Sequence, residues 1–192
     1  MSIHRIAVVG GGTMGNGIAH VAAQHGREVR LLDVSAEVLE GAMATIAKNL
    51  ARQVEREILD ESARDATLGR IETSTDVAAG AEGVDLVIEA VPEKLELKQS
   101  LFRSVAEHTP ESCVFGTNTS SLSVAKIASA VPDPSRMVGL HFFNPVHIMK
   151  LLEVITKDTV HIATEGSMVG QINGLAVYFM GDHAFGKPSR IT

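Results

Sequence analysis

The sequence lacks several features that would point to other kinds of protein. Cys113 is its one cysteine among 192 residues, which excludes an internal disulfide and is typical of a reducing cytoplasm. No grouping of Cys and His has the spacing of a zinc site, so we expect no metal. No apolar run approaches the roughly 20 residues of a membrane span, and the first predicted strand starts too early to leave room for a signal peptide. We therefore expect a cytoplasmic protein with no membrane contact.

Positive charge is also in short supply. Lys and Arg number 17 against 23 Asp and Glu, which gives a net charge of −6 and argues against a nucleic-acid partner. An anionic substrate would therefore need a local basic patch. The hydrophobic content of 45% indicates a globular chain, and 192 residues suffice for one hydrophobic core and a small additional subdomain.

The stretch from Ile6 to Asp33 organises the rest of the chain. It opens with an unbroken apolar run that suits a strand buried on both faces. Gly10, Gly12 and Gly15 follow at G-x-G-x-x-G spacing, and a small-residue helical face comes after them. A second strand-like run then ends on the acid. This order of strand, glycine turn, helix, strand and acid is the fingerprint of dinucleotide binding.

Each glycine has a physical reason in that fingerprint. Gly10 lets the chain turn sharply out of the strand, Gly12 lets a pyrophosphate approach the backbone, and Gly15 lets helix and strand pack closely. The helix N-terminus offers free N–H groups and a partial positive charge to the phosphates. Thr13 and Met14 lie in this turn and complete the expected cofactor-binding set there.

Asp33 lies eighteen residues past Gly15, where the second strand ends. A carboxylate there can accept hydrogen bonds from both ribose hydroxyls of the adenosine half and would repel a 2′-phosphate. The sequence therefore predicts NAD rather than NADP. A FAD-type site shares the fingerprint and is the main alternative, and a glycine turn without a ligand is the other.

The remainder of the chain alternates strands with helices. We expect strands over residues 71–74, 84–89, 113–116, 137–141 and 150–155, and helices over 36–59, 60–68, 78–81, 95–108, 122–130 and 164–180. The alternation predicts an α/β fold, a doubly wound parallel Rossmann-type sheet with helices on both faces. We assign residues 1–186 to one NAD-binding domain and 187–192 to a last strand or the start of a linker.

Ligands of such sheets sit beyond the carboxyl ends of the strands. Four segments should therefore surround one crevice: Gly10–Gly15, Ala90–Lys98, Asn118–Ser121 and His141–Asn144.

Three residues can carry the chemistry that a hydride carrier requires. Oxidation of a secondary alcohol needs a base for the hydroxyl proton, and His141 lies at a predicted strand end. Glu153 on the next strand could fix its tautomer, and Ser120 could orient a substrate oxygen. The alternatives are a buried structural histidine, a surface glutamate, and a serine that only caps the following helix.

A stripe of cations recurs at i, i+4 and i+8 on the predicted long helix: Lys48, Arg52 and Arg56. A solvated face paired with Glu55 and Glu57 is the plain interpretation. In an acidic chain the same stripe is also the clearest candidate for binding a phosphorylated substrate.

Four motifs together resemble the L-3-hydroxyacyl-CoA dehydrogenases, particularly the bacterial 3-hydroxybutyryl-CoA type. They are GGGTMGNGIA, VIEAVPE with Lys98 five residues on, TNTSSL and HFFNPVHIMKLLEVI. The resemblance covers residues 3–156. It implies that His141 is the general base, Glu153 its partner and Ser120 a contact to the substrate oxygen.

The resemblance also implies ligand contacts. Glu93, Lys98, Ser120 and Asn144 match cofactor-contacting positions of the family. The family binds CoA partly through the long helix after the Asp33 strand, which makes the cation stripe, with Asn49 as a polar contact, a candidate CoA site.

The chain departs from the family at its end. The family continues into a helical second domain that supplies another active-site asparagine and most of the dimer contact, and this sequence ends before it. We expect the surface facing that domain to be apolar and to favour a homo-oligomer.

Three hypotheses follow. The first is an enzyme that interconverts 3-hydroxyacyl-CoA and 3-oxoacyl-CoA using NAD. The second is an NAD-binding module without turnover of its own, and the third is a dehydrogenase of a sugar acid such as L-gulonate.

Overall fold

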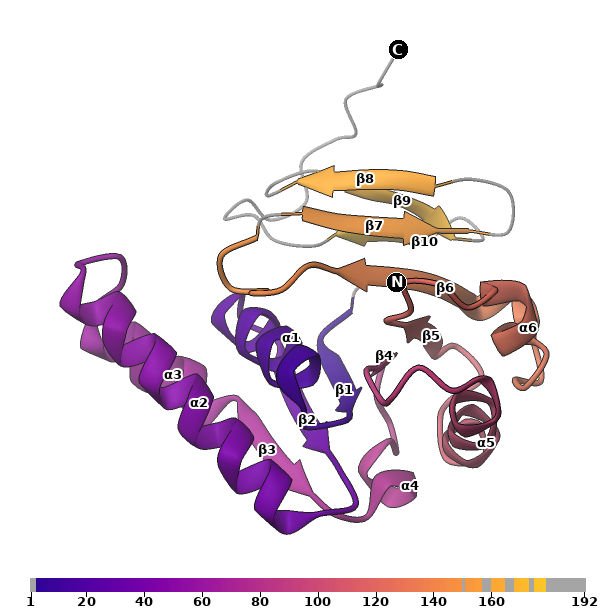
Figure 1. Cartoon of the computed structure of the whole chain (residues 1–192), viewed down its shortest axis with the longest axis horizontal. Coiled ribbons are helices and arrows are strands. Elements are labelled where there is room, and N and C mark those ends of the chain that lie inside the picture. Colours follow the sequence, from indigo (N-terminus) through magenta and orange to yellow (C-terminus); the bar gives the residue numbers. More distant parts are fainter. Residues whose placement is uncertain (1–2, 150, 157–159, 165–167, 173–174, 179–192) are drawn as a thin grey trace.

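An eight-stranded sheet forms the centre of the molecule (Figure 1). The computed structural model describes residues 3–149, 151–156, 160–164, 168–172 and 175–178. Among them the sheet has the order β3-β2-β1-β4-β5-β6-β7-β8, and a separate two-stranded sheet pairs β10 with β9. The strands are β1 (Arg5–Val9), β2 (Glu28–Leu32), β3 (Ile71–Ser74), β4 (Leu86–Glu89), β5 (Val114–Thr117), β6 (Met137–Phe142), β7 (Leu151–Ile155), β8 (Val160–Thr164), β9 (Met168–Ile172) and β10 (Leu175–Tyr178).

Helices cover both faces of this sheet, as Figure 1 shows. They are α1 (Thr13–Gln24), α2 (Ala36–Glu55), α3 (Glu61–Gly69), α4 (Val77–Gly80), α5 (Leu95–Ala106), α6 (Val124–Ala128) and the short 3₁₀ helix η1 (Pro134–Arg136). All pairs among β1 to β6 are parallel. The predicted doubly wound α/β fold is therefore confirmed for this part of the chain, with the strand order of a dinucleotide-binding sheet.

The core lies in two layers because strand residues alternate between the faces. Ile6 and Val8 of β1 join the cluster under α1 and α2, whereas Ala7 and Val9 join the cluster under α5 and α6. All four are at most 2% exposed. A strand buried on both faces has to be apolar throughout, which explains its unbroken apolar run.

Side-chain caps set the starts of most helices. The carboxylates of Asp60 and Asp76 and the hydroxyls of Ser35 and Ser123 each accept a hydrogen bond from the backbone N–H three residues on. Up to residue 155 the element boundaries agree with the sequence within a few residues, and two helices are the most shortened. Helix α2 ends at Glu55, short of the expected residue 59, and α6 occupies only 124–128 of the expected 122–130.

The sheet is not parallel throughout. β7 pairs antiparallel with β6, and β8 pairs antiparallel with β7. A parallel neighbour needs a crossover of about a dozen residues or more, and the connection over 143–150 is too short for one. The strand expected at 150–155 is present as β7, but with the direction that a hairpin imposes.

The helix expected over residues 164–180 is wrong. This region contains β9 and β10, which pair antiparallel with each other beside β8. The sequence between the two strands is Asn173-Gly174, a pair that favours a two-residue hairpin turn over a continuing helix. The strand or linker expected at 187–192 lies outside the described residues. No helix among the described residues is long and apolar enough to cross a membrane.

A buried histidine joins α1 to neighbouring elements. His20 is 0% exposed, its ring stacks on His147 with 5.4 Å between centroids, and the Gln53 amide of α2 donates to its Nε2 at 3.3 Å. Its Nδ1 has no hydrogen-bond partner among the described residues. Burial, with a smaller contribution from His147, lowers the pKa of His20 from 6.5 to about 4.

This shift predicts acid sensitivity of the fold. Because the native pKa of His20 lies below the unfolded value, the unfolded chain binds the extra proton, and stability falls as the pH drops from about 6.5 towards 4. We expect His20 to account for a loss of about 2 kcal/mol in unfolding free energy between pH 7 and pH 5. Urea unfolding of His20→Gln should show a flatter pH dependence. The exposed-site control His108→Gln should keep the wild-type slope, and an unchanged slope in His20→Gln would contradict the assignment.

Candidate functional site

The candidate site lies where the carboxyl ends of the parallel strands meet. The strand order reverses between β1 and β4, which pair directly with the register Val9↔Glu89. Such a reversal opens a crevice, because the chain leaves the two strands towards opposite sides of the sheet. The glycine turn leaves β1 at this point, and the polar residues that end β4, β5 and β6 lie along the same edge.

The three fingerprint glycines are needed for different reasons. Gly10 has a φ of 106°, and a Cβ there would lie 2.8 Å from the Ala90 oxygen. A Cβ on Gly15 would lie 1.6 Å from the Gly10 oxygen. Both positions are therefore closed by the protein itself. A Cβ on Gly12 would meet no protein atom within 4 Å, so the space beside it is open to a ligand.

The N-terminus of α1 begins at this open space and has no acidic side chain in its own first turn. Its N-cap is Gly12, which offers no side-chain cap. Thr13 is exposed and Met14 half-buried at the same turn. Free N–H groups at a helix N-terminus fit a phosphate, so the residues present suit the pyrophosphate of a dinucleotide.

Asp33 lies directly beside the glycine turn. Its Oδ2 accepts a hydrogen bond from the Gly11 N–H at 2.8 Å, and its Oδ1 accepts one from the Ser35 N–H at 3.1 Å. These two bonds hold the carboxylate in place. Each oxygen retains acceptor capacity for a further donor, such as a ribose hydroxyl.

His141 and Glu153 form a hydrogen-bonded pair. They are direct partners in the antiparallel β6–β7 register, and His141 Nδ1 lies 2.8 Å from Glu153 Oε2. A carboxylate accepts this hydrogen bond and Nδ1–H donates it, so Nε2 is the ring nitrogen that is left to act as a base. The two side chains are 23% and 33% exposed, and the Phe143 ring lies 4.6 Å from the imidazole, which partly shields it from water.

Asn118 supports the strand end that carries this histidine. Its side-chain oxygen accepts a hydrogen bond from the Phe142 N–H at 3.0 Å, and its own N–H donates to the Glu89 carbonyl at 2.8 Å. The residue after β5 therefore connects the ends of β4 and β6. This role had no signal in the sequence beyond the position of Asn118 in the TNTSSL motif.

Glu93 organises the turn after β5. Its Oε1 accepts hydrogen bonds from the Thr119 hydroxyl, from the Ser120 N–H at 3.1 Å and from the Ser121 N–H at 3.2 Å. Partial burial would raise the pKa of this carboxyl. The bonds from Thr119 and Lys98 outweigh that effect and lower it to about 2.

Ser120 itself is exposed at this turn. The cap of α6 is Ser123, whose hydroxyl accepts from the Lys126 N–H at 3.3 Å, so the capping alternative does not apply to Ser120. Asn144 is also exposed, in the segment that follows β6. Both side chains are therefore accessible to a ligand.

Lys98 differs from its expected surroundings. The sequence suggested a cofactor contact, but the side chain is 0% exposed and its ammonium lies 2.6 Å from Glu89 Oε1 and 3.1 Å from Glu93 Oε2. Any influence of Lys98 on a ligand in the crevice therefore passes through the partly exposed Glu93.

Residues 5–175 match the family model described as "3-hydroxyacyl-CoA dehydrogenase, NAD binding domain". The chain belongs to this family. The resemblance based on HFFNP is therefore confirmed, and so is NAD as the cofactor, which removes the FAD-type alternative.

Two curated relatives and one solved structure illustrate the similarity. The chain is 44% identical to 3-hydroxyadipyl-CoA dehydrogenase of Escherichia coli K12 over 90% of its length, and 43% identical to 3-hydroxybutyryl-CoA dehydrogenase of Bradyrhizobium diazoefficiens over 80%. The crystal structure of 3-hydroxybutyryl-CoA dehydrogenase from Escherichia coli K12 superimposes with a TM-score of 0.78 at 46% identity, over 81% of this chain and 33% of that one.

The chain spans only part of these relatives. It covers 35% of the first curated protein and 52% of the second. Members of the 3-hydroxyacyl-CoA dehydrogenase family are NAD-dependent oxidoreductases, and the chain corresponds to their NAD-binding domain.

The cation stripe of the NAD-binding domain is accessible. Lys48 and Arg52 are exposed on α2, and Arg56 is exposed at its C-cap. Asn49 is half-buried on the same helix. Within the part of the chain that the structure describes, none of the three cations forms an ion pair within 4.0 Å, and the proposed pairing with Glu55 and Glu57 is absent.

Glu89 is a further residue of the family domain that was missed at the sequence level. Glu89 is 0% exposed and accepts hydrogen bonds from Lys98 and, at 2.6 Å, from the Thr117 hydroxyl. Burial raises the pKa of Glu89, although Lys98 and Thr117 oppose the shift. The signal was an acid ending a strand that is otherwise apolar, since such a side chain must be paired when buried.

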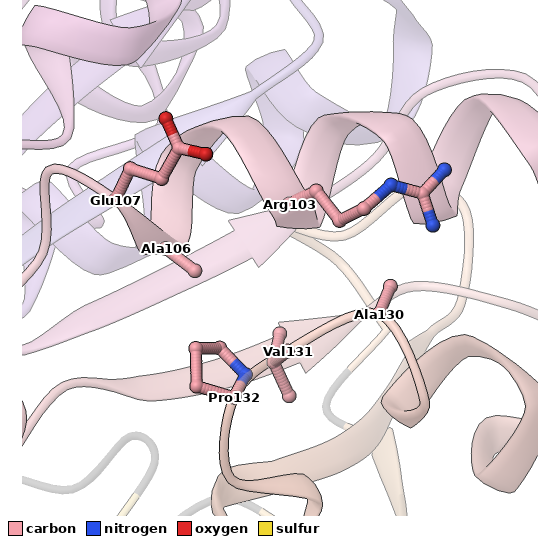
Figure 2. A pocket seen from close by; sticks show the side chains of 6 residues that line it. All are labelled: Arg103, Ala106, Glu107, Ala130, Val131 and Pro132. Atoms are coloured by element: carbon pink, nitrogen blue, oxygen red, sulfur yellow. The ribbon is translucent and has the colours of Figure 1, made fainter.

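A groove of about 310 Å³ lies apart from this site, between the end of α5 and the segment that follows α6. Figure 2 shows Arg103 and Glu107 on the α5 side and Val131 and Pro132 on the facing segment. It shares no residue with the crevice. Among the described residues no group of three or more His, Cys, Asp and Glu is placed to hold a metal ion.

The glycine geometry predicts a separation between folding and cofactor binding. Gly12→Ala should leave the unfolding free energy nearly unchanged, because its Cβ meets no protein atom, but should weaken NADH binding at least tenfold, about 1.4 kcal/mol. Gly15→Ala should instead cost at least about 2 kcal/mol of stability, since it collides with backbone.

Urea unfolding and NADH fluorescence titration measure the two quantities. Gly41→Ala on α2 is the matched control, because its Cβ also meets nothing and lies away from the crevice. Normal NADH binding by Gly12→Ala would show that the cofactor does not approach this backbone.

Proposed function

We propose that this protein transfers a hydride between NAD and the 3-hydroxy or 3-oxo carbon of an acyl-CoA, with His141 as the general base. The observation that carries the proposal is the His141–Glu153 pair, 2.8 Å apart at the sheet edge that also bears the glycine turn. A base held by a carboxylate beside a dinucleotide site is the arrangement that oxidation of a secondary alcohol requires.

The base acts through one nitrogen. In the oxidation direction, His141 Nε2 accepts the hydroxyl proton as the hydride leaves the carbon, and in reduction it returns the proton to the oxygen. NAD supplies the hydride acceptor. Glu153 accepts the hydrogen bond from Nδ1–H throughout and stabilises the imidazolium that forms, while Phe143 limits access of water to the ring.

The other crevice residues position the reactants. Ser120 presents its hydroxyl for the substrate oxygen, with its backbone held by Glu93. Asn144 and Glu93 would hold the nicotinamide half of the cofactor, and Lys98 would act there through its ion pair with Glu93. On the adenosine half, Asp33 would accept hydrogen bonds from the ribose hydroxyls, and the turn from Gly10 to Gly15 with Thr13 and Met14 would hold the pyrophosphate.

The cation stripe supplies the patch that an anionic substrate needs. Lys48, Arg52 and Arg56 are exposed, with Asn49 beside them, and bind the phosphates of CoA. A chain of contacts leads from this helix to the catalytic segment: Gln53 of α2 donates to His20, which stacks on His147, six residues after the proposed base. The helix that carries the stripe is therefore in contact, through these side chains, with the segment that follows β6.

The base assignment predicts a split between binding and turnover. His141→Gln should reduce NADH-dependent turnover of acetoacetyl-CoA by roughly a hundredfold or more, because general-base catalysis is lost, and should leave the NADH dissociation constant nearly unchanged. Glu153→Gln should also reduce turnover, since its amide no longer stabilises the imidazolium. His108→Gln, at an exposed site, is the control.

The same assay tests the substrate class. Acetoacetyl-CoA with NADH is compared with L-gulonate and NAD, and turnover of the sugar acid alone would replace the acyl-CoA proposal. Tight NADH binding without turnover of either substrate would favour a binding module. Normal turnover by His141→Gln would contradict the general-base role and would show that His141 is a structural histidine.

The stripe predicts selective and salt-sensitive recognition of CoA. Replacing Arg52 and Arg56 with Ala should raise KM for acetoacetyl-CoA several-fold and have little effect on a short thioester that lacks the nucleotide. Arg103→Ala combined with Lys126→Ala removes two exposed cations from other helices and serves as the control. An equal loss for both substrates would make the stripe a solvated helix face.

A further inference from the structure

We infer that Glu89 is a positioning residue: through Lys98 and Glu93 it holds the Ser120 turn in place and so prepares the nicotinamide half of the crevice. The inference deepens the proposed function and rests on its placement of NAD in the crevice. It concerns a residue that reaches no ligand itself.

Glu89 joins three separate elements below the crevice. It is the last residue of β4 and is 0% exposed. Its Oε1 accepts from Lys98 Nζ of α5 at 2.6 Å and from the Val91 N–H at 2.7 Å, and its Oε2 accepts from the Thr117 hydroxyl of β5 at 2.6 Å. The carboxylate thus fixes the segment leaving β4 against the end of β5.

Lys98 depends on this carboxylate. A fully buried ammonium is costly unless it is paired and hydrogen-bonded. Its other neighbours are Glu93 Oε2 at 3.1 Å and two backbone carbonyls, of Val91 at 3.4 Å and Asn118 at 3.5 Å. Of the two carboxylates, Glu89 is fully buried and lies closer to the ammonium than Glu93 does. Glu89 therefore determines the position of the Lys98 ammonium.

Glu93 carries the arrangement to the surface. One of its oxygens meets Lys98, and the other accepts from the backbone N–H groups of Ser120 and Ser121. The two carboxylates share one ammonium, so Glu93 keeps a net negative charge available for those N–H groups. The backbone of Ser120 is therefore connected to the buried Glu89 through two intervening side chains, Glu93 and Lys98.

The location restricts the effect to one half of the cofactor. The glycine turn and Asp33 follow β1 and β2, on the other side of the strand reversal, and within the described part of the chain no side-chain hydrogen bond of Glu89 reaches them. Adenosine contacts should be independent of Glu89, whereas nicotinamide contacts should depend on it.

Two ligands separate these halves: NADH, and ADP-ribose, which lacks the nicotinamide. We expect Glu89→Gln, which keeps the shape but removes the charge, to weaken NADH binding at least fivefold and to change ADP-ribose binding less than twofold, by calorimetric titration. Glu96→Gln, at an exposed site on α5, is the matched control and should change neither. Equal weakening of both ligands, or no change in either, would overturn the inference.

A double variant distinguishes positioning from simple support of the fold. Glu89→Gln with Lys98→Met removes both buried charges, and a neutral replacement of a buried pair often folds well. Because Glu93 has then lost its anchor, NADH binding should stay weakened while ADP-ribose binding stays normal. Recovery of NADH affinity in the double variant would show that the ion pair only supports folding.

The outcomes also separate this inference from the proposed function. Failure of the wild-type protein to bind NADH would remove the cofactor assignment on which both rest. Normal NADH and ADP-ribose binding by the wild type, without a selective loss in the variants, would overturn only the role of Glu89.

Discussion

Parallel pairing of β1 with β4 is the constraint on which the site depends. It places Val9 opposite Glu89, so the glycine turn and the polar network of β4 and β5 start from the same level of the sheet. The close approach of Gly15 to the Gly10 carbonyl and of Gly10 to Ala90 lets α1 and the chain after β4 flank that point. The glycine turn is then fixed by backbone geometry, which is the kind of preorganisation that binding needs.

Two kinds of polar burial support this arrangement differently. The Glu89–Lys98 pair is hydrogen-bonded on both sides and ties three elements together. His20 is equally buried but leaves one nitrogen unpartnered, and its neutral form is the one that the interior tolerates. The Glu89–Lys98 pair fixes the relative positions of the elements that it joins through charged hydrogen bonds. The neutral His20 ring fills a packed position between helices, and protonation of the ring would disturb that packing.

Much of this could be predicted from the sequence, because local rules and tertiary structure agree there. The apolar run before Gly10, the caps at Ser35 and Asp60, and the strand ends at Asp33 and His141 all follow from residue type and spacing. The direction of β7 could have been predicted from its short connection, and the β9–β10 pair from Asn173-Gly174. The burial of Lys98 could not, because a lysine on an amphipathic helix normally lies at the surface, and only the three-dimensional position of Glu89 and Glu93 shows otherwise.

The antiparallel pairing of β6 and β7 has a consequence for how this region can change. Successive side chains of a strand point to opposite faces of the sheet. His141 and Glu153 therefore lie on the same face only if the register of the two strands is kept or shifts by an even number of residues. A slip of a single residue along β7 would turn the carboxylate to the opposite face of the sheet and leave Leu152 or Val154 facing the imidazole. An insertion or deletion between these strands therefore preserves the pair only if it changes the loop and leaves the β6–β7 register as it is. A shift of one residue in that register would separate the two side chains.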